Sequence, residues 1–269
     1  GKGPADGALN RGGAYYLAAR HAFDRTAVLR LGGQDGVHGS LAWIKSDNRA
    51  QAETELAAGT LDYSNALGTL GLTWVHGLDV NEQWASDFQR QRDGMNVYSI
   101  RGEGSAGIPD AFFAFEYARQ HKREGDETAW YGEAAYSFSE LPWTPKLTYR
   151  YSRYSEAWDS LFTGQSTGYG TWFQGEVAAN YSGPFATNVG IHHLGLLAHP
   201  REDVTLGALY YDINSVNTRS ALNLDARELD LYVEWAVSEH LIVTPLIGLY
   251  KPEKDAGSGG NQVGGNGTN

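Results

Sequence analysis

Several residue types that mark common protein classes are absent or rare in this sequence. Its 269 residues include no cysteine, which excludes a disulfide scaffold, a cysteine-ligated zinc site and a thiol nucleophile. The formal net charge of −11 argues against binding to nucleic acid, whose phosphates attract basic surfaces. No stretch has the roughly 18 consecutive apolar residues of a membrane-spanning helix, and HExxH, GxSxG and P-loop motifs are missing. We therefore expect no enzyme, no metal site and no cofactor.

The sequence is instead rich in glycine, in aromatic residues and in a two-residue alternation of apolar and polar side chains. Glycine accounts for 34 residues and aromatic residues for 12% of the chain. In one clear example, Leu229, Leu231 and Val233 share one face of a strand and Asp230 lies on the other. The alternation predicts about thirteen strands, over residues 12–22, 25–33, 38–46, 65–76, 94–104, 109–121, 126–139, 143–153, 169–181, 186–199, 202–213, 226–237 and 240–251.

Alternating strands of about ten residues, joined by small polar turns, are typical of a transmembrane β-barrel. Tryptophans near predicted strand ends, such as Trp43, Trp130 and Trp143, fit the aromatic girdles at a membrane surface. A soluble β-sandwich or sugar-binding β-domain, whose core holds the same aromatic residues, is the alternative. We expect an all-β, antiparallel transmembrane β-barrel in a bacterial outer membrane, with residues 1–269 as a single domain.

Four blocks in the C-terminal half carry a family resemblance. They read KLTYRYS at 146–152, GTWFQGE at 170–176, LYYD at 209–212 and ELDLYVEW at 228–235. In these blocks and their spacing, residues 140–251 resemble the alginate-export family of bacterial outer-membrane β-barrels. The resemblance implies a barrel of about eighteen strands that passes a polysaccharide or oligosaccharide. Strands before residue 12 and a closing strand after residue 251 would then lie outside this chain.

In a barrel, the side chains opposite the apolar face of each strand line the lumen. Basic residues there attract anionic solutes, and aromatic residues offer faces to sugar rings. The predicted lining comprises Arg20, Arg30, Arg101, Lys146 and Arg150, the acidic residues Glu116, Glu133, Glu176 and Asp230, and the aromatic residues Tyr131 and Trp172. Arg150 is the first candidate for solute contact, because a guanidinium binds a carboxylate through two hydrogen bonds; Lys146 is the second.

Structural roles are the alternative for each of these residues. Charged side chains on neighbouring strands form ion pairs that stiffen the wall, and aromatic side chains fill space in the lumen. Inward acids also outnumber inward bases, which departs from the arginine-rich constriction of the alginate-export family. The adjacent His192 and His193 point to opposite faces of a strand and cannot chelate one metal ion.

The predicted function is passive diffusion of a hydrophilic, anionic, alginate-like polysaccharide. A general or nutrient-specific porin and a non-conducting structural or binding barrel are the alternatives. The expected partners are a polysaccharide or oligosaccharide solute, outer-membrane lipid and lipopolysaccharide, and periplasmic export components. Counting back from an extracellular connection at 252–269 places the connection 154–168 on the periplasmic side, which requires a periplasmic gate or a different strand count between 150 and 200.

Overall fold

A computed structural model describes residues 25–47, 49–161, 187–219, 223, 225–255 and 257. Within these ranges, thirteen strands form an antiparallel sheet in which hydrogen bonds follow chain order from β1 to β12, and β13 pairs with β11. None of the helices in the described ranges is long and apolar enough to cross a membrane. The chain divides into two compact units, residues 1–102 with 117–127, and residues 103–116 with 128–269.

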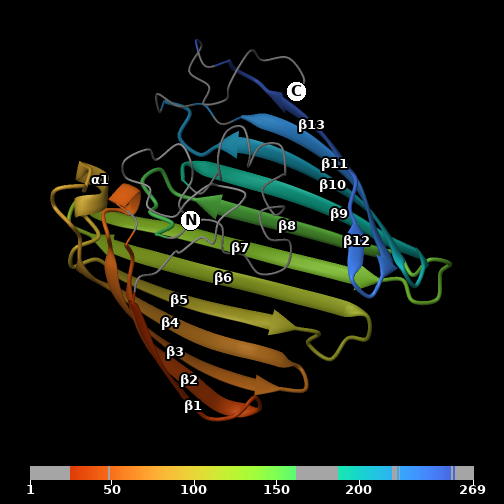
Figure 1. Ribbon diagram of the computed structural model, residues 1–269, viewed down its shortest axis with the longest axis horizontal. Helices are drawn as coiled ribbons and strands as arrows, with labels where there is room; N and C mark the ends of the chain where they lie inside the picture. Colours follow the sequence, from red (N-terminus) through yellow and green to blue (C-terminus); the bar gives the residue numbers. More distant parts are fainter. Residues whose placement is uncertain are drawn as a thin grey trace. The chain divides into compact units, whose positions relative to one another are not determined.

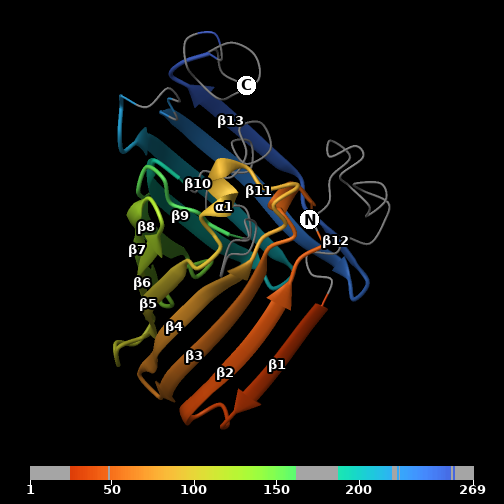
Figure 2. The ribbon, with the colours of Figure 1, turned by 90° about the vertical axis from the view of Figure 1, so that its left-hand side faces the viewer.

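The first unit contains four strands that lie side by side (Figure 2). They are β1 (Arg25–Leu31), β2 (Gly36–Lys45), β3 (Glu55–Asn65) and β4 (Gly68–Asp79). Pairing is antiparallel, so that Ser40 of β2 lies between Arg30 of β1 and Thr60 of β3. The unit also takes in residues 96–102 of β5 (Asn96–Gly104) and parts of β6 (Ala111–Lys122) and β7 (Gly125–Ser137). The 3-10 turn η2 (Arg49–Gln51) and helix α1 (Asp87–Arg90) lie in its connections (Figure 1).

The second unit contains the rest of β5 to β7 and the later strands. These are β8 (Lys146–Tyr154), β9 (Val189–Arg201), β10 (Val204–Ser215), β11 (Ala226–Ser238), β12 (Leu241–Val243) and β13 (Leu246–Pro252). Both β12 and β13 pair with β11, and Thr244 and Pro245 separate them. Proline has no backbone N–H to give to a strand ladder. The single strand predicted at 240–251 is therefore interrupted here.

Burial alternates along the strands and divides the side chains between two faces. In β8, Thr148, Arg150 and Ser152 are buried, whereas Leu147 and Tyr149 are exposed. We call the side with the buried residues the inner face and the side with exposed apolar residues the outer face. Leucines facing outward while charged residues are buried is the reverse of a soluble core, so this arrangement does not fit the β-sandwich alternative.

Short and long connections alternate within each unit. In the first unit, residues 32–35 and 66–67 join β1 to β2 and β3 to β4, whereas 46–54 and 80–95 make the intervening, longer connections. In the second unit, residues 202–203 join β9 to β10, and 216–225 join β10 to β11. Short turns at one end and longer loops at the other are typical of outer-membrane barrels. We call the end with the short turns the turn end and the end with the longer loops the loop end. The β6–β7 connection at 123–124 is short although it lies at the loop end.

The connection after β8 corrects a sequence-based prediction. Tyr154 of β8 pairs with Val189 of β9, so residues 155–188 join two neighbouring strands at the loop end of the second unit. The prediction placed 154–168 at the opposite end because it inserted a strand at 169–181 before the next one. Residues 169–181 lie outside the described part of the chain, but the direct pairing leaves no place for a strand between β8 and β9. A periplasmic gate is not needed.

A second correction concerns β3, because the sequence pattern assigned residues 47–64 to a connection. The strand contains Ala57, Ala58, Gly59 and Thr60, and such small side chains give little contrast between its two faces. The other predicted strands in the described ranges correspond to strands of the structure, with ends that differ by a few residues. The predicted strand at 12–22 lies outside the described residues.

Candidate pore-lining face

One level of the inner face in the second unit carries a row of polar and aromatic side chains. Cross-strand pairing aligns one residue from each of six strands, and five of the six are almost completely buried. We call this set the inner row; it consists of Glu133, Arg150, His193, Tyr211, Glu228 and Tyr250. The row brings the charged residues Glu133, Arg150 and Glu228 to one level of the inner face.

Arg150 is held at the start of the inner row by three neighbours. Its Nη1 lies 3.3 Å from Glu133 Oε2, its Nε donates to Ser152 Oγ at 3.2 Å, and its guanidinium carbon lies 3.8 Å from the ring centre of Tyr131. The ion pair with Glu133 is a contact between neighbouring strands, as expected if Arg150 has a structural role in the wall. Contact between Arg150 and a solute stays a prediction.

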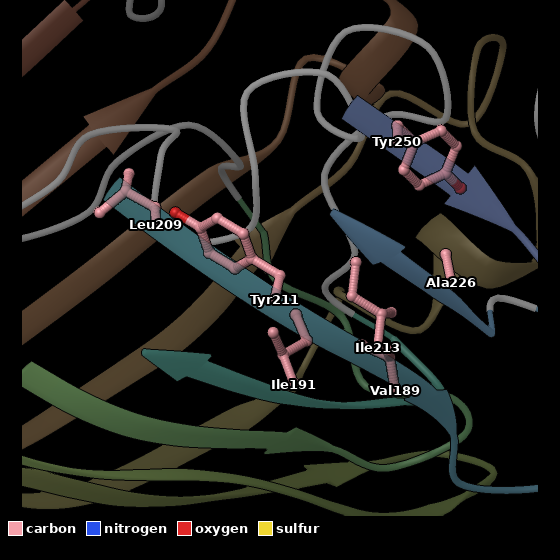
Figure 3. Packing of buried hydrophobic residues seen from close by; sticks show 7 residues of the cluster. All are labelled: Val189, Ile191, Leu209, Tyr211, Ile213, Ala226 and Tyr250. Atoms are coloured by element: carbon pink, nitrogen blue, oxygen red, sulfur yellow. The ribbon is translucent and has the colours of Figure 1, made fainter. Parts of the chain in front are cut away.

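His193 and Tyr211 form the middle of the inner row. Their rings stack at 4.7 Å with an interplanar angle of 11°. Tyr211 and Tyr250 also belong to an apolar cluster, and the side chains of Leu209, Tyr211 and Ile213 project from the same side of β10 (Figure 3). The sequence does not single out His193 or Tyr211, because only the pairing of the strands shows that these residues lie at the same level of the sheet as Arg150.

In the first unit, Arg101 is the basic residue with the most extensive inner-face contacts. Its Nη2 lies 2.5 Å from Asp62 Oδ1, and its Nη1 donates to the hydroxyl of Thr73. Arg101 and Asp62 come from β5 and β3, so the pair crosses β4, where Gly71 stands opposite Asp62. Arg30 lies on the same face as its partner Ser40, on a strand that is exposed throughout.

The remaining predicted residues are distributed along the inner face or lie outside the described ranges. Lys146 is half-buried, with its Nζ 5.9 Å from the ring centre of Phe112. Glu116 is half-buried on β6, and Asp230 is buried on β11. Arg20, Glu176 and Trp172 lie outside the described residues. In the described strands of the second unit, the inward positions carry two bases, Lys146 and Arg150, and six acids, Glu103, Glu116, Glu133, Glu228, Asp230 and Glu234.

The described residues contain no group of three or more histidine, aspartate or glutamate side chains arranged to hold a metal ion. His192 is exposed on the outer face and His193 is buried on the inner face, as the alternation predicted.

The sheet is antiparallel between neighbouring strands, and short turns alternate with longer loops. Its leucines face outward and its charged residues are buried on the inner face. These features together are those of the wall of an outer-membrane β-barrel. No protein-family model matches the sequence, and no curated protein matches it. Among solved structures, the chain is similar to the crystal structure of OccK11 (OpdR) from Pseudomonas aeruginosa, an outer-membrane porin, with a TM-score of 0.56 and 14% sequence identity. The match covers 85% of this chain and 65% of OccK11.

At this level of identity, the similarity shows the fold. The predicted fold class, an all-β antiparallel sheet of the outer-membrane β-barrel type, is confirmed. The same similarity supports the predicted location in a bacterial outer membrane. It does not distinguish the alginate-export family from other barrels, so that resemblance stays a prediction. The chain spans about 65% of the length of the porin it matches.

Proposed function

We propose that this chain forms part of an outer-membrane porin, a water-filled channel through which small hydrophilic solutes diffuse passively. The observation that carries the proposal is the inversion of burial: Arg150, Glu228 and Asp230 are buried on the inner face, while leucines cover the outer face. A sheet of this kind presents apolar side chains to lipid on one face and polar side chains on the other. The structural similarity to a porin supports the same function.

The charges of the inner face favour cations. In the described strands of the second unit, Glu116, Glu133, Glu228 and Asp230 are among six inward acids, against the two bases Lys146 and Arg150. An excess of carboxylates along a confined path raises the local concentration of cations. We therefore propose a general or nutrient-specific porin with a preference for cations.

An anionic saccharide, such as an alginate-like chain, is the second candidate solute. The observation in its favour is the contact between Arg150 and Tyr131, 3.8 Å from guanidinium to ring centre. A guanidinium binds a uronate carboxylate through two hydrogen bonds, and an adjacent aromatic ring offers a face to the sugar. Lys146 lies on the same strand and face, and would add a second positive charge.

Reversal potentials of the full-length protein in planar bilayers test the proposal. Under a potassium chloride gradient we expect cation selectivity, and Glu234→Gln should reduce it because an inward carboxylate that is exposed on β11 is removed. Asp212→Asn removes a carboxylate from the outer face and serves as the matched control, with selectivity unchanged.

Two results would contradict the cation-selective porin. Anion selectivity, with block by oligouronates that disappears in Arg150→Gln, would favour the saccharide channel. Insertion without any conductance would favour a non-conducting barrel.

A further inference from the structure

On the inner face of the first unit, an acid of β3 holds an arginine of β5. Among the inward positions of β2, β3 and β4, strands that the structure describes completely, Asp62 is the one acidic residue, and His38 stands opposite it. The inward bases of β1 and β5 are Arg30 and Arg101. Without Asp62, this wall would present both arginines to a solute as uncompensated positive charges.

Arg101 makes the contacts of an anion-binding site whose anion is a side chain of the protein. Its Nη2 lies 2.5 Å from Asp62 Oδ1, and its Nη1 donates to the hydroxyl of Thr73. Hydroxyl groups continue across the sheet, because Thr73 stands opposite Thr60, whose Oγ1 lies 2.9 Å from Ser40 Oγ. A guanidinium binds carboxylate and phosphate oxygens through charge-assisted hydrogen bonds. The carboxylate of Asp62 takes the place of such an anion here.

The two partners of this ion pair differ in exposure. The side chain of Asp62 is 9% exposed, whereas that of Arg101 is 34% exposed. The carboxylate is therefore covered by the wall, and the guanidinium remains within reach of a solute that follows the inner face. A small anion at this place meets a guanidinium whose charge is already balanced, and the carboxylate of Asp62 repels it.

The second unit contains a similar ion pair, and its exposure shows why Arg101 is the arginine to consider. Arg150 Nη1 lies 3.3 Å from Glu133 Oε2, and only 8% of the Arg150 side chain is exposed. Of these two paired arginines, Arg101 is thus the one that a passing solute can contact. The acid that balances Arg101 has the larger effect on which ions approach the wall.

We propose that Asp62 determines the selectivity of this wall by occupying the anion-binding site of Arg101, so that small inorganic anions such as phosphate are excluded from it. Asp62 acts through Arg101 and is in this sense a positioning residue. The inference rests on the proposed porin function, because exclusion from the wall affects transport only where solutes pass along the inner face. It reconciles two inward arginines in the first unit with a preference for cations.

Block of the full-length channel in planar bilayers by inorganic phosphate tests the site. In Asp62→Asn, the released guanidinium and Thr73 should bind phosphate about tenfold more tightly than in the wild type, the gain expected from one charge-assisted hydrogen bond. This block should disappear in Asp62→Asn/Arg101→Gln, which lacks the guanidinium as well. Glu103→Gln is the matched control, since it removes an exposed inward carboxylate of β5 and leaves the ion pair in place. It should lower cation selectivity without adding phosphate block.

A second neutral variant, Asp62→Ala, repeats the test without an amide oxygen that could still accept from Arg101. Unchanged phosphate affinity in both Asp62 variants, equal block in Glu103→Gln, or block that persists in the double variant would overturn the inference. Isothermal titration of the same variants with phosphate in detergent micelles tests the site without conductance. Cation-selective conductance without phosphate binding by the Asp62 variants refutes only the site, and phosphate binding by them without conductance refutes only the channel.

Discussion

Gly71 shows how one residue without a side chain allows two charges to meet across a strand. It lies opposite Asp62, and a Cβ at this position would overlap Asp62 Oδ1 and lie 3.1 Å from the guanidinium of Arg101. The absence of a side chain on β4 therefore gives Arg101 of β5 room to reach Asp62 of β3. This ion pair fixes the arginine against the inner face instead of leaving it extended.

Replacement of this glycine should break the ion pair. We expect Gly71→Ala to lower the free energy of unfolding by about 1–3 kcal/mol, since Asp62 is buried and loses its charged partner. Gly132→Ala is the matched control, because a Cβ at position 132 meets nothing within 4 Å. Urea unfolding in lipid vesicles measures both changes, and equal destabilisation by the two variants would contradict the explanation.

Alternation in the sequence correctly assigns Arg101 and Arg150 to the inner face. An ion pair with a neighbouring strand was the structural alternative for Arg150, and its contact with Glu133 fits that alternative, but the sequence did not indicate Asp62 as the partner of Arg101. Glu133 and Asp62 become partners only through the register of β7 with β8 and the gap left by Gly71 on β4. Register depends on hydrogen bonds between segments far apart in the sequence, which a single-strand pattern does not contain. For the same reason, the sequence does not predict that His193 of β9 lies directly beside Arg150 of β8.

Among the connecting elements, residues 46–54 and 80–95 pack against each other through a buried arginine. Arg92 donates to the carbonyl of Gln51 at 3.3 Å, to Thr54 Oγ1 at 3.0 Å and to Gln51 Oε1 at 3.1 Å. Ala52, Val80 and Ala85 form a small apolar cluster beside it. Helix α1 in the second connection begins with a capping box between Ser86 and Gln89. These contacts give the first unit an ordered surface at its loop end.

We expect Arg92→Gln to loosen residues 46–54, because Gln51 Oε1 and Thr54 Oγ1 lose the guanidinium as a donor, whereas the carbonyl of Gln51 keeps its hydrogen bonds from Thr54. Hydrogen exchange of the amides in this segment should become faster, by about tenfold for a loss near 1.4 kcal/mol. Arg90→Gln is the control, since Arg90 is only half-buried and pairs with Glu82 and Asp87 within its own connection. Unchanged exchange in Arg92→Gln would show that the apolar cluster alone holds the two connections together.

The β9–β10 turn contains a carboxylate whose ionised form is favoured by folding. Partial desolvation acts to raise the pKa of Asp203, but hydrogen bonds from its own backbone, from Trp235 and from Arg201 hold this pKa below its ordinary value. The indole Nε1 of Trp235 donates to Asp203 at 3.1 Å. Because the pKa of Asp203 is lower in the folded than in the unfolded protein, its ionisation stabilises the fold at pH values above the pKa of the unfolded protein, about 3.9. This contribution is lost as the pH falls through the pKa of the folded protein.

Asp203→Asn should therefore unfold at a lower temperature than the wild type at neutral pH, with a difference that shrinks between about pH 5 and about pH 1. Thermal unfolding followed at several pH values measures the difference. Trp235→Phe removes one of the hydrogen bonds and should show a smaller effect with the same pH dependence. A difference between wild type and Asp203→Asn that stays constant with pH would mean that the carboxylate charge does not contribute.

On the scale of the whole molecule, composition and alternation predict the class of the fold. Where a strand consists of small residues, however, the sequence does not identify it. Long strands with outward leucines are visible in the sequence because an apolar outer face must be continuous along each strand. β3 was missed because Ala57, Ala58 and Gly59 weaken that contrast. The side assigned to the connection after β8 was wrong because one extra strand reverses the direction of every strand counted beyond it.

Pro245 has a consequence for the cooperativity of the sheet. Because it lacks a backbone N–H and separates β12 from β13, the ladder beside β11 consists of two segments, a short one at Trp235 to Ser238 and a long one at Ala226 to Tyr232. Rupture of the short segment does not require rupture of the long one. Local opening at β12 is thereby uncoupled from the part of the inner row on β11 and β13, so thermal fraying at the turn end stays confined there.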